Sequence, residues 1–424
     1  MDSTFRWSFE GKSTHLASRA AAALAMAFAL AVATPRAQAQ TYTVIHTFGG
    51  ADGVSPWAGL TMDAGGNLYG TARGGGTHND GTVFRLRKSG SGWVLNTLYS
   101  FAGGNDGTEP RGRVSLARDG TLYGTTFFGG GPGCYNGNGC GTIFHLIPPP
   151  VAPRSALTPW NETVLYRFSG GSDGGYPRGD LTFDPPGNIY GTADYGGDNY
   201  GVIYELMPSN GGWTQTVIYT PQGSGGGTDP QGGVIFDRAG SLDGVFEAGG
   251  QYGYGTVYQL SPSGSDWTEQ TLYAFTGERD GQNPVAGLII DSSGNLYGAT
   301  SAGGTYFGGT VFELTPNNGG WTYNWVYGFL AGGVVDKLVM DAAGNLYGTT
   351  QVDGAYRFGA VFKLSPLNGG WIYKSLYDFT GRNDGAYPMS NLVFDANGNL
   401  YGTTSEGGSP NCLGGCGVVF EITP

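Results

Sequence analysis

Short apolar runs that alternate with polar residues recur along the chain, and glycine-rich turns separate them. In one copy, the runs 288–290 and 295–300 flank the turn 291–295 (Asp-Ser-Ser-Gly-Asn), which is typical of a β-hairpin because Asp bonds its own backbone and Gly accepts a positive φ. Two further alternating runs, 310–314 and 321–329, follow and are rich in β-branched and aromatic residues. Four antiparallel strands joined by short turns predict one blade of a β-propeller.

The sequence Gly-Asn-Leu-Tyr-Gly at 398–402 allows the copies to be counted. It recurs at 294–298 and 344–348, and looser copies end at Gly70, Gly124, Gly191 and Gly244. The final glycines of the seven copies are 54, 67, 53, 54, 50 and 54 residues apart, and a period of this size indicates a repeat architecture. We therefore predict an all-β fold in which residues 40–424 form a single seven-bladed β-propeller of four-stranded antiparallel blades. The repeats are expected to end near residues 101, 168, 221, 275, 329, 379 and 424.

The two ends of the repeat region predict how the ring closes. The last copy stops after its third strand, 418–422, while the run 44–48 aligns with a fourth strand, 271–275. The N-terminal strand is therefore expected to close the last blade, with residues 43–48 paired to 417–422, which removes two open strand edges. An open stack of repeats is the alternative, but the complementary ends favour the closed ring.

The repeat tyrosines are expected to be core residues on the second strands, packed between neighbouring blades. The glycine that follows each of them is expected to leave room for a side chain of the adjacent blade. These tyrosines are Tyr69, Tyr123, Tyr190, Tyr297, Tyr347 and Tyr401.

Residues 1–39 have the pattern of a secretory signal peptide. Basic residues precede the apolar run 20–34, and residues 37–39 (Ala-Gln-Ala) fit a small-x-small cleavage site. The apolar run is short for a membrane span, and an uncleaved anchor is the alternative. We therefore expect an exported protein, periplasmic or extracellular, without a membrane span after signal cleavage.

Composition and charge narrow the classes of partner. The chain has 81 glycines in 424 residues, but they lie at periodic turns, so low-complexity disorder is a poor interpretation. The formal net charge is −12, and it becomes −14 without the four basic and two acidic residues of the segment 1–39. Such an acidic chain is a poor match for nucleic acid or anionic lipid, and no nucleic-acid partner is expected.

The four cysteines form two close pairs, each in the loop between the second and third strands of its own repeat. Export favours disulfides over metal thiolates, so we predict the bridges Cys134–Cys140 and Cys412–Cys416. Because the loops that they close are small, their expected effect is mainly to stiffen these loops.

The motif Asp-x-x-Gly-Asn-Leu-Tyr-Gly-Thr-Thr at 341–350 and 395–404, followed by Gly-Gly, Gly-Thr-Val-Phe-x-Leu and Gly-Gly-Trp elements, resembles a bacterial repeat family. It looks like the GloVer (Gloeobacter–Verrucomicrobia) tandem-repeat proteins over nearly all of residues 41–424. The resemblance implies an exported repeat protein and provides no catalytic residues to transfer. More distantly, the Asp-x-x-Gly-Asn hairpin is similar to NHL-type propellers, which include both binders and enzymes.

Histidine and carboxylate positions predict no metal site, and no cofactor is expected. His46 takes the place that Tyr273 holds in another repeat, and His145 lies in a column of mixed charge that we expect at the surface. His78 has no neighbour at a metal-binding spacing. The aspartate of the recurring Asp-Gly-x-x-Pro segment, such as Asp280, is expected to cap a turn, because one carboxylate per loop is too few for calcium.

Blade 4 departs from the repeat pattern. Asp243 replaces the repeat tyrosine, and Glu247 stands three residues after Gly244. Two carboxylates could support general acid–base chemistry, so a propeller hydrolase or lyase is an alternative function that requires both side chains to converge in one pocket. Drift in a degenerate repeat is the other interpretation.

The loops between the second and third strands of blades 3 to 6 carry pairs of aromatic residues, which we name the aromatic arc. In an up-and-down blade these loops share a face with the Asp-Gly-x-x-Pro connections. Aromatic rings beside Gly, Asn and Asp suit a glycan or a peptide, and the scarcity of charge favours the glycan, whereas packing between blades is the alternative. The aromatic arc is Tyr195, Tyr200, Tyr252, Tyr254, Tyr306, Phe307, Tyr356 and Phe358.

Together these features predict an exported, non-catalytic repeat protein with a binding or scaffold role. The expected partner is a carbohydrate or cell-surface polymer, or a protein. A purely structural component of the cell envelope is a further alternative.

Overall fold

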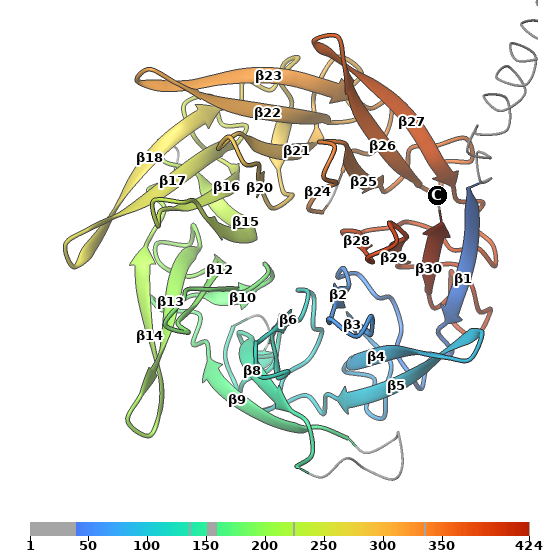
Figure 1. Cartoon of the computed structure of the whole chain (residues 1–424). Helices are drawn as coiled ribbons and strands as arrows, with labels where there is room; N and C mark the ends of the chain where they lie inside the picture. Colours follow the sequence, from blue (N-terminus) through green and yellow to red (C-terminus); the bar gives the residue numbers. More distant parts are fainter. Residues whose placement is uncertain (1–39, 135–136, 151–158, 224, 335, 424) are drawn as a thin grey trace, which may run out of the picture. The chain divides into compact units, whose positions relative to one another are not determined.

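Seven antiparallel β-sheets surround a common axis in the computed structural model, one for each repeat (Figure 1). The structure describes residues 40–134, 137–150, 159–223, 225–334 and 336–423, and this part of the chain contains β-strands but no α-helix. The predicted seven-bladed β-propeller is confirmed.

Each blade runs from an inner strand near the axis to an outer strand at the rim (Figure 1). In blades 3 and 5 the inner strand is divided into two short pieces. Blades 1 to 3 comprise β2 (Thr61–Met62), β3 (Leu68–Ala72), β4 (Thr82–Ser89) and β5 (Gly92–Ser100); β6 (Ser115–Leu116), β7 (Leu122–Thr126), β8 (Thr142–Ile147) and β9 (Asn161–Arg167); and β10 (Gly175–Pro177), β11 (Thr182–Phe183), β12 (Ile189–Tyr195), β13 (Val202–Ser209) and β14 (Gly212–Tyr219).

The remaining blades follow the same plan. Blades 4 to 6 comprise β15 (Thr228–Phe236), β16 (Leu242–Ala248), β17 (Thr256–Ser263) and β18 (Asp266–Ala274); β19 (Gln282–Pro284), β20 (Ile289–Ile290), β21 (Leu296–Ala302), β22 (Thr310–Asn317) and β23 (Gly320–Gly328); and β24 (Val339–Met340), β25 (Leu346–Thr350), β26 (Ala360–Leu367) and β27 (Gly370–Asp378). Blade 7 comprises β28 (Val393–Phe394), β29 (Leu400–Thr404), β30 (Val418–Thr423) and β1 (Thr41–Thr47).

Strand β1 closes the ring as the outer strand of blade 7. It pairs antiparallel with β30 from Thr41 opposite Thr423 to Thr47 opposite Val418, so the first and last strands lie side by side (Figure 1). The predicted closure by the N-terminal strand is confirmed, with a pairing that begins two residues earlier in the chain than expected.

The hydrophobic core is divided among the boundaries between blades. Seven clusters of buried residues are found in the described part of the chain, and each combines side chains of two neighbouring blades. Blades are therefore held together by apolar burial between sheets, which is the dominant favourable term in folding.

The repeat tyrosine lies at such a boundary, as predicted. Tyr297 is buried and packs with residues of blade 6, and its ring centroid is 6.4 Å from that of Trp371. Its hydroxyl donates a hydrogen bond to Glu313 (2.8 Å) and lies 3.4 Å from a carboxylate oxygen of Asp291. Tyr123 of blade 2 is only half-buried. The buried equivalents are Tyr69, Tyr190, Tyr347 and Tyr401.

The glycine after each repeat tyrosine makes room within its own blade. A Cβ atom at Gly298 would lie 2.5 Å from Phe312 and 2.8 Å from Leu288, and both belong to blade 5. Phe312 is the cross-strand partner of Gly298. The expectation that this space admits a side chain of the adjacent blade was wrong, because the large third-strand residue lies across its own strand pair.

The Asp-Gly-x-x-Pro segments connect the outer strand of one blade to the inner strand of the next. Asp280 accepts hydrogen bonds from the backbone N–H of Thr276 (2.7 Å) and the hydroxyl of Tyr273 (2.9 Å), so the expected turn cap is confirmed. The proline packs on the preceding blade: a Cβ atom at Gly255 would lie 2.5 Å from Pro284. These contacts hold the residues on either side of the proline near the axis.

The residue before this proline has a positive φ in six blades although it is never glycine, a conformation that costs L-residues free energy and is frequent at functional sites. These residues are Ser55 (φ 52°), Glu109 (54°), Tyr176 (59°), Asp229 (57°), Asn283 (55°) and Tyr387 (53°).

The predicted signal peptide, residues 1–39, lies outside the described residues. So do residues 151–158 of the insertion between β8 and β9. Within the described ranges, no helix combines the length and the apolar character needed to span a membrane.

Candidate ligand-binding site

The loops between the second and third strands lie on the same face of the ring as the connections between blades. Their last residues accept backbone hydrogen bonds from the residue before the next proline: the carbonyl of Tyr254 accepts from Asn283 (3.0 Å) and that of Phe358 accepts from Tyr387 (2.8 Å). We name this surface the loop face. It joins the aromatic arc to the residues at the axis.

Most of the aromatic arc is exposed to solvent. Phe358 alone among its eight members is half-buried, beside the cluster between blades 6 and 7. The exposed fractions are 38% for Tyr195 and Tyr200, 50% for Tyr252, 42% for Tyr254, 53% for Tyr306, 83% for Phe307 and 58% for Tyr356. These seven rings therefore do not belong to the core between blades, which was the alternative interpretation. Their role in ligand binding remains a prediction.

Three rings of the arc rest on glycines of the connections. A Cβ atom at Gly277 would lie 2.6 Å from the ring of Tyr254, and one at Gly223 would lie 2.9 Å from Tyr200. Phe358 lies in the same way against Gly381. The missing side chain lets each ring approach the backbone, so the backbone supports one side of it.

Both predicted disulfides are present, with Cα–Cα distances of 5.3 Å for Cys134–Cys140 and 5.1 Å for Cys412–Cys416. Cys140 holds the sequence position that Tyr254 holds in blade 4, directly before the glycine that leads into the third strand. The two sulfur atoms of the first bridge lie against Gly170. In blade 2 the disulfide therefore covers the connection as an aromatic ring does in blades 3, 4 and 6.

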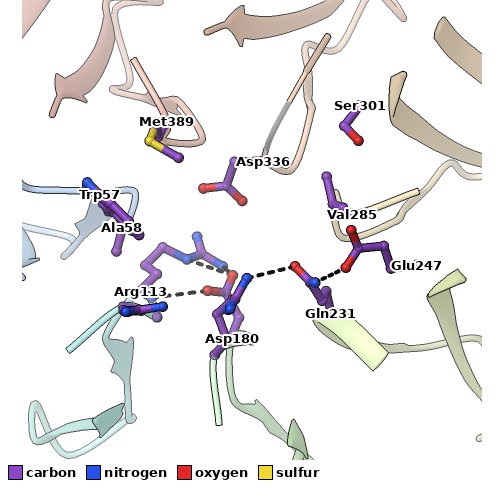
Figure 2. A pocket seen from close by; sticks show the side chains of 15 residues that line it. Trp57, Ala58, Arg113, Asp180, Gln231, Glu247, Val285, Ser301, Asp336 and Met389 are labelled. Carbon is purple, nitrogen blue, oxygen red and sulfur yellow. Dashed lines mark hydrogen bonds and ion pairs between the residues drawn. The ribbon is translucent and has the colours of Figure 1, made fainter. Parts of the chain in front are cut away.

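A pocket of about 500 Å³, which we name the central pocket, lies at the axis among the connections (Figure 2). All seven blades contribute to it, chiefly with residues that follow the repeated proline or end a second strand. Its lining is Trp57, Ala58, Arg111, Gly112, Arg113, Arg178, Gly179, Asp180, Gln231, Gly232, Glu247, Val285, Ser301, Asp336 and Met389.

Except for Glu247, sequence reasoning did not identify the lining of this pocket. The signal was present in the repeat: in blades 1 to 5 and 7, the position after the proline holds Trp57, Arg111, Arg178, Gln231, Val285 and Met389. The residue type at this position changes from blade to blade while the neighbouring residues repeat. The fold of the blade therefore does not depend on which side chain stands there.

An ion pair between adjacent blades forms part of the pocket wall. Nη2 of Arg113 lies 2.8 Å from Oδ2 of Asp180, and the backbone N–H of Arg113 donates to the other carboxylate oxygen (3.3 Å). Asp336 of blade 6 accepts backbone hydrogen bonds from Lys337 (2.6 Å) and Asn391 (2.8 Å). Burial raises the pKa of Asp336, and repulsion from Asp180 adds to the rise.

A second polar chain links blades 3 and 4 (Figure 2). Nε of Arg178 lies 3.0 Å from a carboxylate oxygen of Asp194, and Nη1 of Arg178 donates to Oε1 of Gln231 (3.1 Å). The amide of Gln231 in turn donates to Glu247. Burial raises the pKa of Asp194 to about 7, against the attraction of Arg178, and the charges of Asp229 and Glu247 add to the rise. Burial also raises the pKa of Glu247.

Two arginines share one carboxylate at the boundary of blades 1 and 2. Glu109 accepts from Arg73 (3.0 Å) and from Arg111 (2.6 Å). The guanidinium carbon of Arg111 lies 3.7 Å from the ring centroid of Phe127, and that of Arg73 lies 4.3 Å from the ring centroid of Trp57. This contact of cations with aromatic faces is favourable and fixes the guanidinium planes.

The carboxylates of blade 4 do not form the predicted pair. Glu247 lines the central pocket, whereas Asp243 is 1% exposed and lies in the second strand at the buried position of the repeat tyrosine. Asp243 accepts a hydrogen bond from Gln259 (2.9 Å). The convergence that the catalytic alternative required of these two residues is therefore absent.

The described histidines lie in the strands and loops of the blades. His46 bonds Asp52 (2.8 Å) as Tyr273 bonds Asp280 in blade 5, which confirms that it substitutes for a strand residue. His145 is half-buried and stacks on Tyr123, so the expectation of a surface position was wrong. Within the described residues, no group of three or more His, Cys, Asp or Glu side chains is placed to hold a metal ion.

A family model described as the Gloeobacter/Verrucomicrobia repeat matches residues 32–235 and 199–420. No curated protein matches the sequence.

Solved structures with a related fold have low sequence identity to this chain. A gluconolactonase from Xanthomonas campestris is 14% identical, with a TM-score of 0.39 over 62% of this chain and 74% of that chain. A suggested 6-phosphogluconolactonase from Bacteroides uniformis is 12% identical, with a TM-score of 0.49 over 86% and 89%. A protein of unknown function from Dyadobacter fermentans is 12% identical, with a TM-score of 0.43 over 78% and 96%. Similarity at this level assigns no activity to the chain.

Proposed function

The chain belongs to the Gloeobacter/Verrucomicrobia repeat family, and from this premise we propose that it is an exported, non-catalytic propeller that binds a glycan on its loop face through the aromatic arc. The two disulfides support export, because such bridges persist in oxidising compartments.

The observation that carries this proposal is the exposure of seven aromatic rings on one face of four neighbouring blades. Elsewhere in the blades, tyrosine and phenylalanine are mostly buried at the boundaries between sheets. Exposed aromatic side chains leave apolar surface in contact with water, and a ligand that covers this surface lowers the free energy. A group of such side chains on one face therefore favours a binding role.

The surroundings of the arc favour a glycan over a peptide. The loops combine aromatic rings with Gly, Asn, Asp and Thr, and they carry few charges. Rings supported by backbone glycine, such as Tyr254 on Gly277, offer a free side to the C–H groups of a sugar. The polar neighbours offer donors and acceptors to its hydroxyl groups.

The test replaces one ring supported by glycine, Tyr254, and one more exposed ring, Tyr306, together, as Tyr254→Ala with Tyr306→Ala. Wild type and variant are applied to an array of neutral oligosaccharides and peptidoglycan fragments. Trp325→Ala is the matched control, because Trp325 is 50% exposed on the outer strand β23, outside the aromatic arc. All three proteins are also melted.

We expect the double variant to keep its melting temperature and to lose the binding that the wild type and the control share. A wild type that binds nothing on the array, or a double variant that binds as well as wild type, contradicts the proposal. A large fall in melting temperature of the double variant would show that the rings stabilise the fold and also contradicts it.

A hydrolase or lyase is a second candidate, favoured by the carboxyl group of Asp194, which lies behind the pocket lining against Arg178. A carboxyl group whose pKa is raised to about 7 can give or take a proton near neutral pH. Incubation with each bound glycan, followed by an assay for new reducing ends and unsaturated products, tests this candidate. Turnover that Asp194→Asn abolishes would replace the non-catalytic proposal.

A further inference from the structure

The three arginines that line the central pocket keep hydrogen-bond donors free. Arg113 uses Nε and Nη2 on Asp180, and Arg111 uses Nε and Nη2 on Glu109. Neither Nη1 group has a protein partner among the described residues. Each guanidinium has five N–H donors, so both can bind a further oxyanion.

Arg178 also keeps one of its Nη groups free. Its Nε faces Asp194 and its Nη1 donates to Gln231, which leaves Nη2 without a protein partner in the described ranges. The side chain is also 37% exposed, so a ligand in the pocket can reach it. Arg111 and Arg178 follow the prolines of adjacent blades, and their guanidinium carbons lie 3.7 and 5.2 Å from the ring centroid of Phe127, so the two cations reach the pocket as neighbours.

The acceptors of the pocket are more fully engaged than its donors. Asp180 accepts from the side chain and the backbone of Arg113. Both oxygens of Asp336 accept backbone N–H groups, from Lys337 and Asn391. Of the three carboxylates among the described lining residues, Glu247 alone keeps one oxygen open, because it is bonded to Gln231 through the other. Free donors thus outnumber free acceptors.

The arginines also repel one another. The pKa of Arg111 is lowered chiefly by burial, and the charges of Arg73 and Arg178 add to this effect against the attraction of Glu109. A shared anion relieves such repulsion, since charge-assisted hydrogen bonds from guanidinium to carboxylate are strong and bidentate.

The rest of the lining is suited to a sugar ring. Trp57 and Met389 reach the pocket from blades 1 and 7, and Ser301 and Glu247 reach it from blades 5 and 4 (Figure 2). Apolar groups on one side and hydroxyl-binding groups on the other match the two faces of a pyranose. The volume of about 500 Å³ lies within the range of about 300–1,000 Å³ that is usual for small-molecule sites.

We propose that the central pocket binds an acidic sugar, a hexuronate, with its carboxylate on Arg178 and Arg111 and its C–H face toward Trp57 and Met389. Glu247 and Ser301 then accept and donate hydrogen bonds with the ring hydroxyls. This site is separate from the aromatic arc and does not depend on it.

Isothermal titration of the full chain with galacturonate, glucuronate and trigalacturonate tests this inference, with galactose, glucose and acetate as the comparison ligands. We expect at least one of the three uronate ligands to bind, the neutral sugars not to bind, and acetate to bind at least about tenfold more weakly. Arg178→Gln removes the free donors and is expected to weaken uronate binding at least about tenfold.

Two further variants separate a site from a general charge effect. Arg87→Gln removes an exposed arginine at the opposite end of blade 1, near the turn between β4 and β5, and is expected to leave uronate affinity unchanged. Glu247→Gln keeps a side-chain oxygen that can accept from the ring hydroxyls and removes the negative charge that repels a carboxylate, so it is expected to raise uronate affinity.

The inference is overturned if no uronate binds, if galactose or glucose binds as well as its uronate, or if acetate matches the uronates. Equal loss in Arg87→Gln and Arg178→Gln overturns it as well. Because these titrations use a pocket and ligands different from those of the aromatic-arc test, either proposal can fail while the other stands.

Discussion

Tyr42 of β1 stacks on Tyr377 of β27, with ring centroids 3.7 Å apart and ring planes inclined by 8°. The hydroxyl of Tyr42 also donates to the backbone carbonyl of Asp384 in the connection that leaves blade 6. The N-terminal strand therefore does more than complete the sheet of blade 7, since it also packs against blade 6. Ring closure joins a strand pairing to an aromatic contact between blades.

Deletion of residues 40–48 should abolish cooperative folding or cause aggregation. The deletion removes β1, exposes the edge of β30 and uncovers the aromatic surface around Tyr377. Size-exclusion chromatography and thermal melting measure the result. The single change Tyr42→Ala keeps the pairing and should lower stability without aggregation. A soluble, monomeric deletion variant that melts cooperatively would contradict the closure.

Replacement of a repeat tyrosine separates ring packing from the hydroxyl network. Tyr297→Ala should destabilise the protein by roughly 3–5 kcal/mol, the range for deletion of a buried large aromatic side chain. Tyr297→Phe keeps the ring and removes one donor to Glu313, so it should cost only about 1–2 kcal/mol. Urea unfolding of both variants gives the comparison. Equal stability of wild type and Tyr297→Ala would show that the boundary between blades does not depend on this ring.

The disulfides should contribute modestly, because each closes a short loop. Cys134 and Cys140 are 6 residues apart, and Cys412 and Cys416 are 4 apart. The chain-entropy estimate for loops of this length is about 2 kcal/mol per bridge. Cys412→Ala with Cys416→Ala should lower the free energy of unfolding by about that amount and leave the chain folded. Loss of folding would mean that the bridge holds blade 7 together.

The blades could be predicted from sequence because the residues that build them repeat. In five of the described hairpins the Asp, its Asn and the repeat tyrosine form one hydrogen-bonded group, as in Asp395, Asn399 and Tyr401 (2.8 and 3.1 Å). Such a group needs the same residues in nearly every blade. The number of blades followed from the positions of these groups along the chain, and the ring closure followed from the complementary strands at the two ends of the repeat region.

The central pocket could not be predicted in the same way, because its residues do not repeat. Arg111 and Arg178 occupy equivalent positions in blades 2 and 3, whereas blade 5 has Val285 there. Only the ring brings these positions together at the axis. The sequence pattern pointed to Asp243, because this residue replaces the repeat tyrosine. Its side chain, however, lies in the boundary between blades and not in the pocket.

Asp243 is an ionisable group at a core position. It is 1% exposed, and one of its carboxylate oxygens has no hydrogen-bond partner in the described structure, while the other accepts from Gln259. Burial raises its pKa from 3.8 to about 7, the bond from Gln259 opposes this rise, and the charge of Asp237 adds to it. The folded state therefore favours the protonated carboxyl group, whereas the unfolded state ionises near 3.8.

The destabilisation caused by Asp243 depends on pH in a defined direction. It is absent below pH 3.8, grows as the pH rises from 3.8 to about 7, and is complete above that value. Asp243→Asn removes the charge, so it should raise the free energy of unfolding at pH 8 by on the order of a few kcal/mol and have little effect at pH 4. Urea unfolding at the two pH values measures the difference between variant and wild type.

The exposed residue Asp198 provides the matched control for this substitution. Asp198→Asn makes the same chemical change on the surface, so it should alter stability little and equally at both pH values. An Asp243→Asn variant that is stabilised equally at pH 4 and pH 8 would indicate a packing effect rather than a charge effect. A variant that is destabilised at pH 8 would show that the folded protein accommodates the ionised carboxylate and that the raised pKa is wrong.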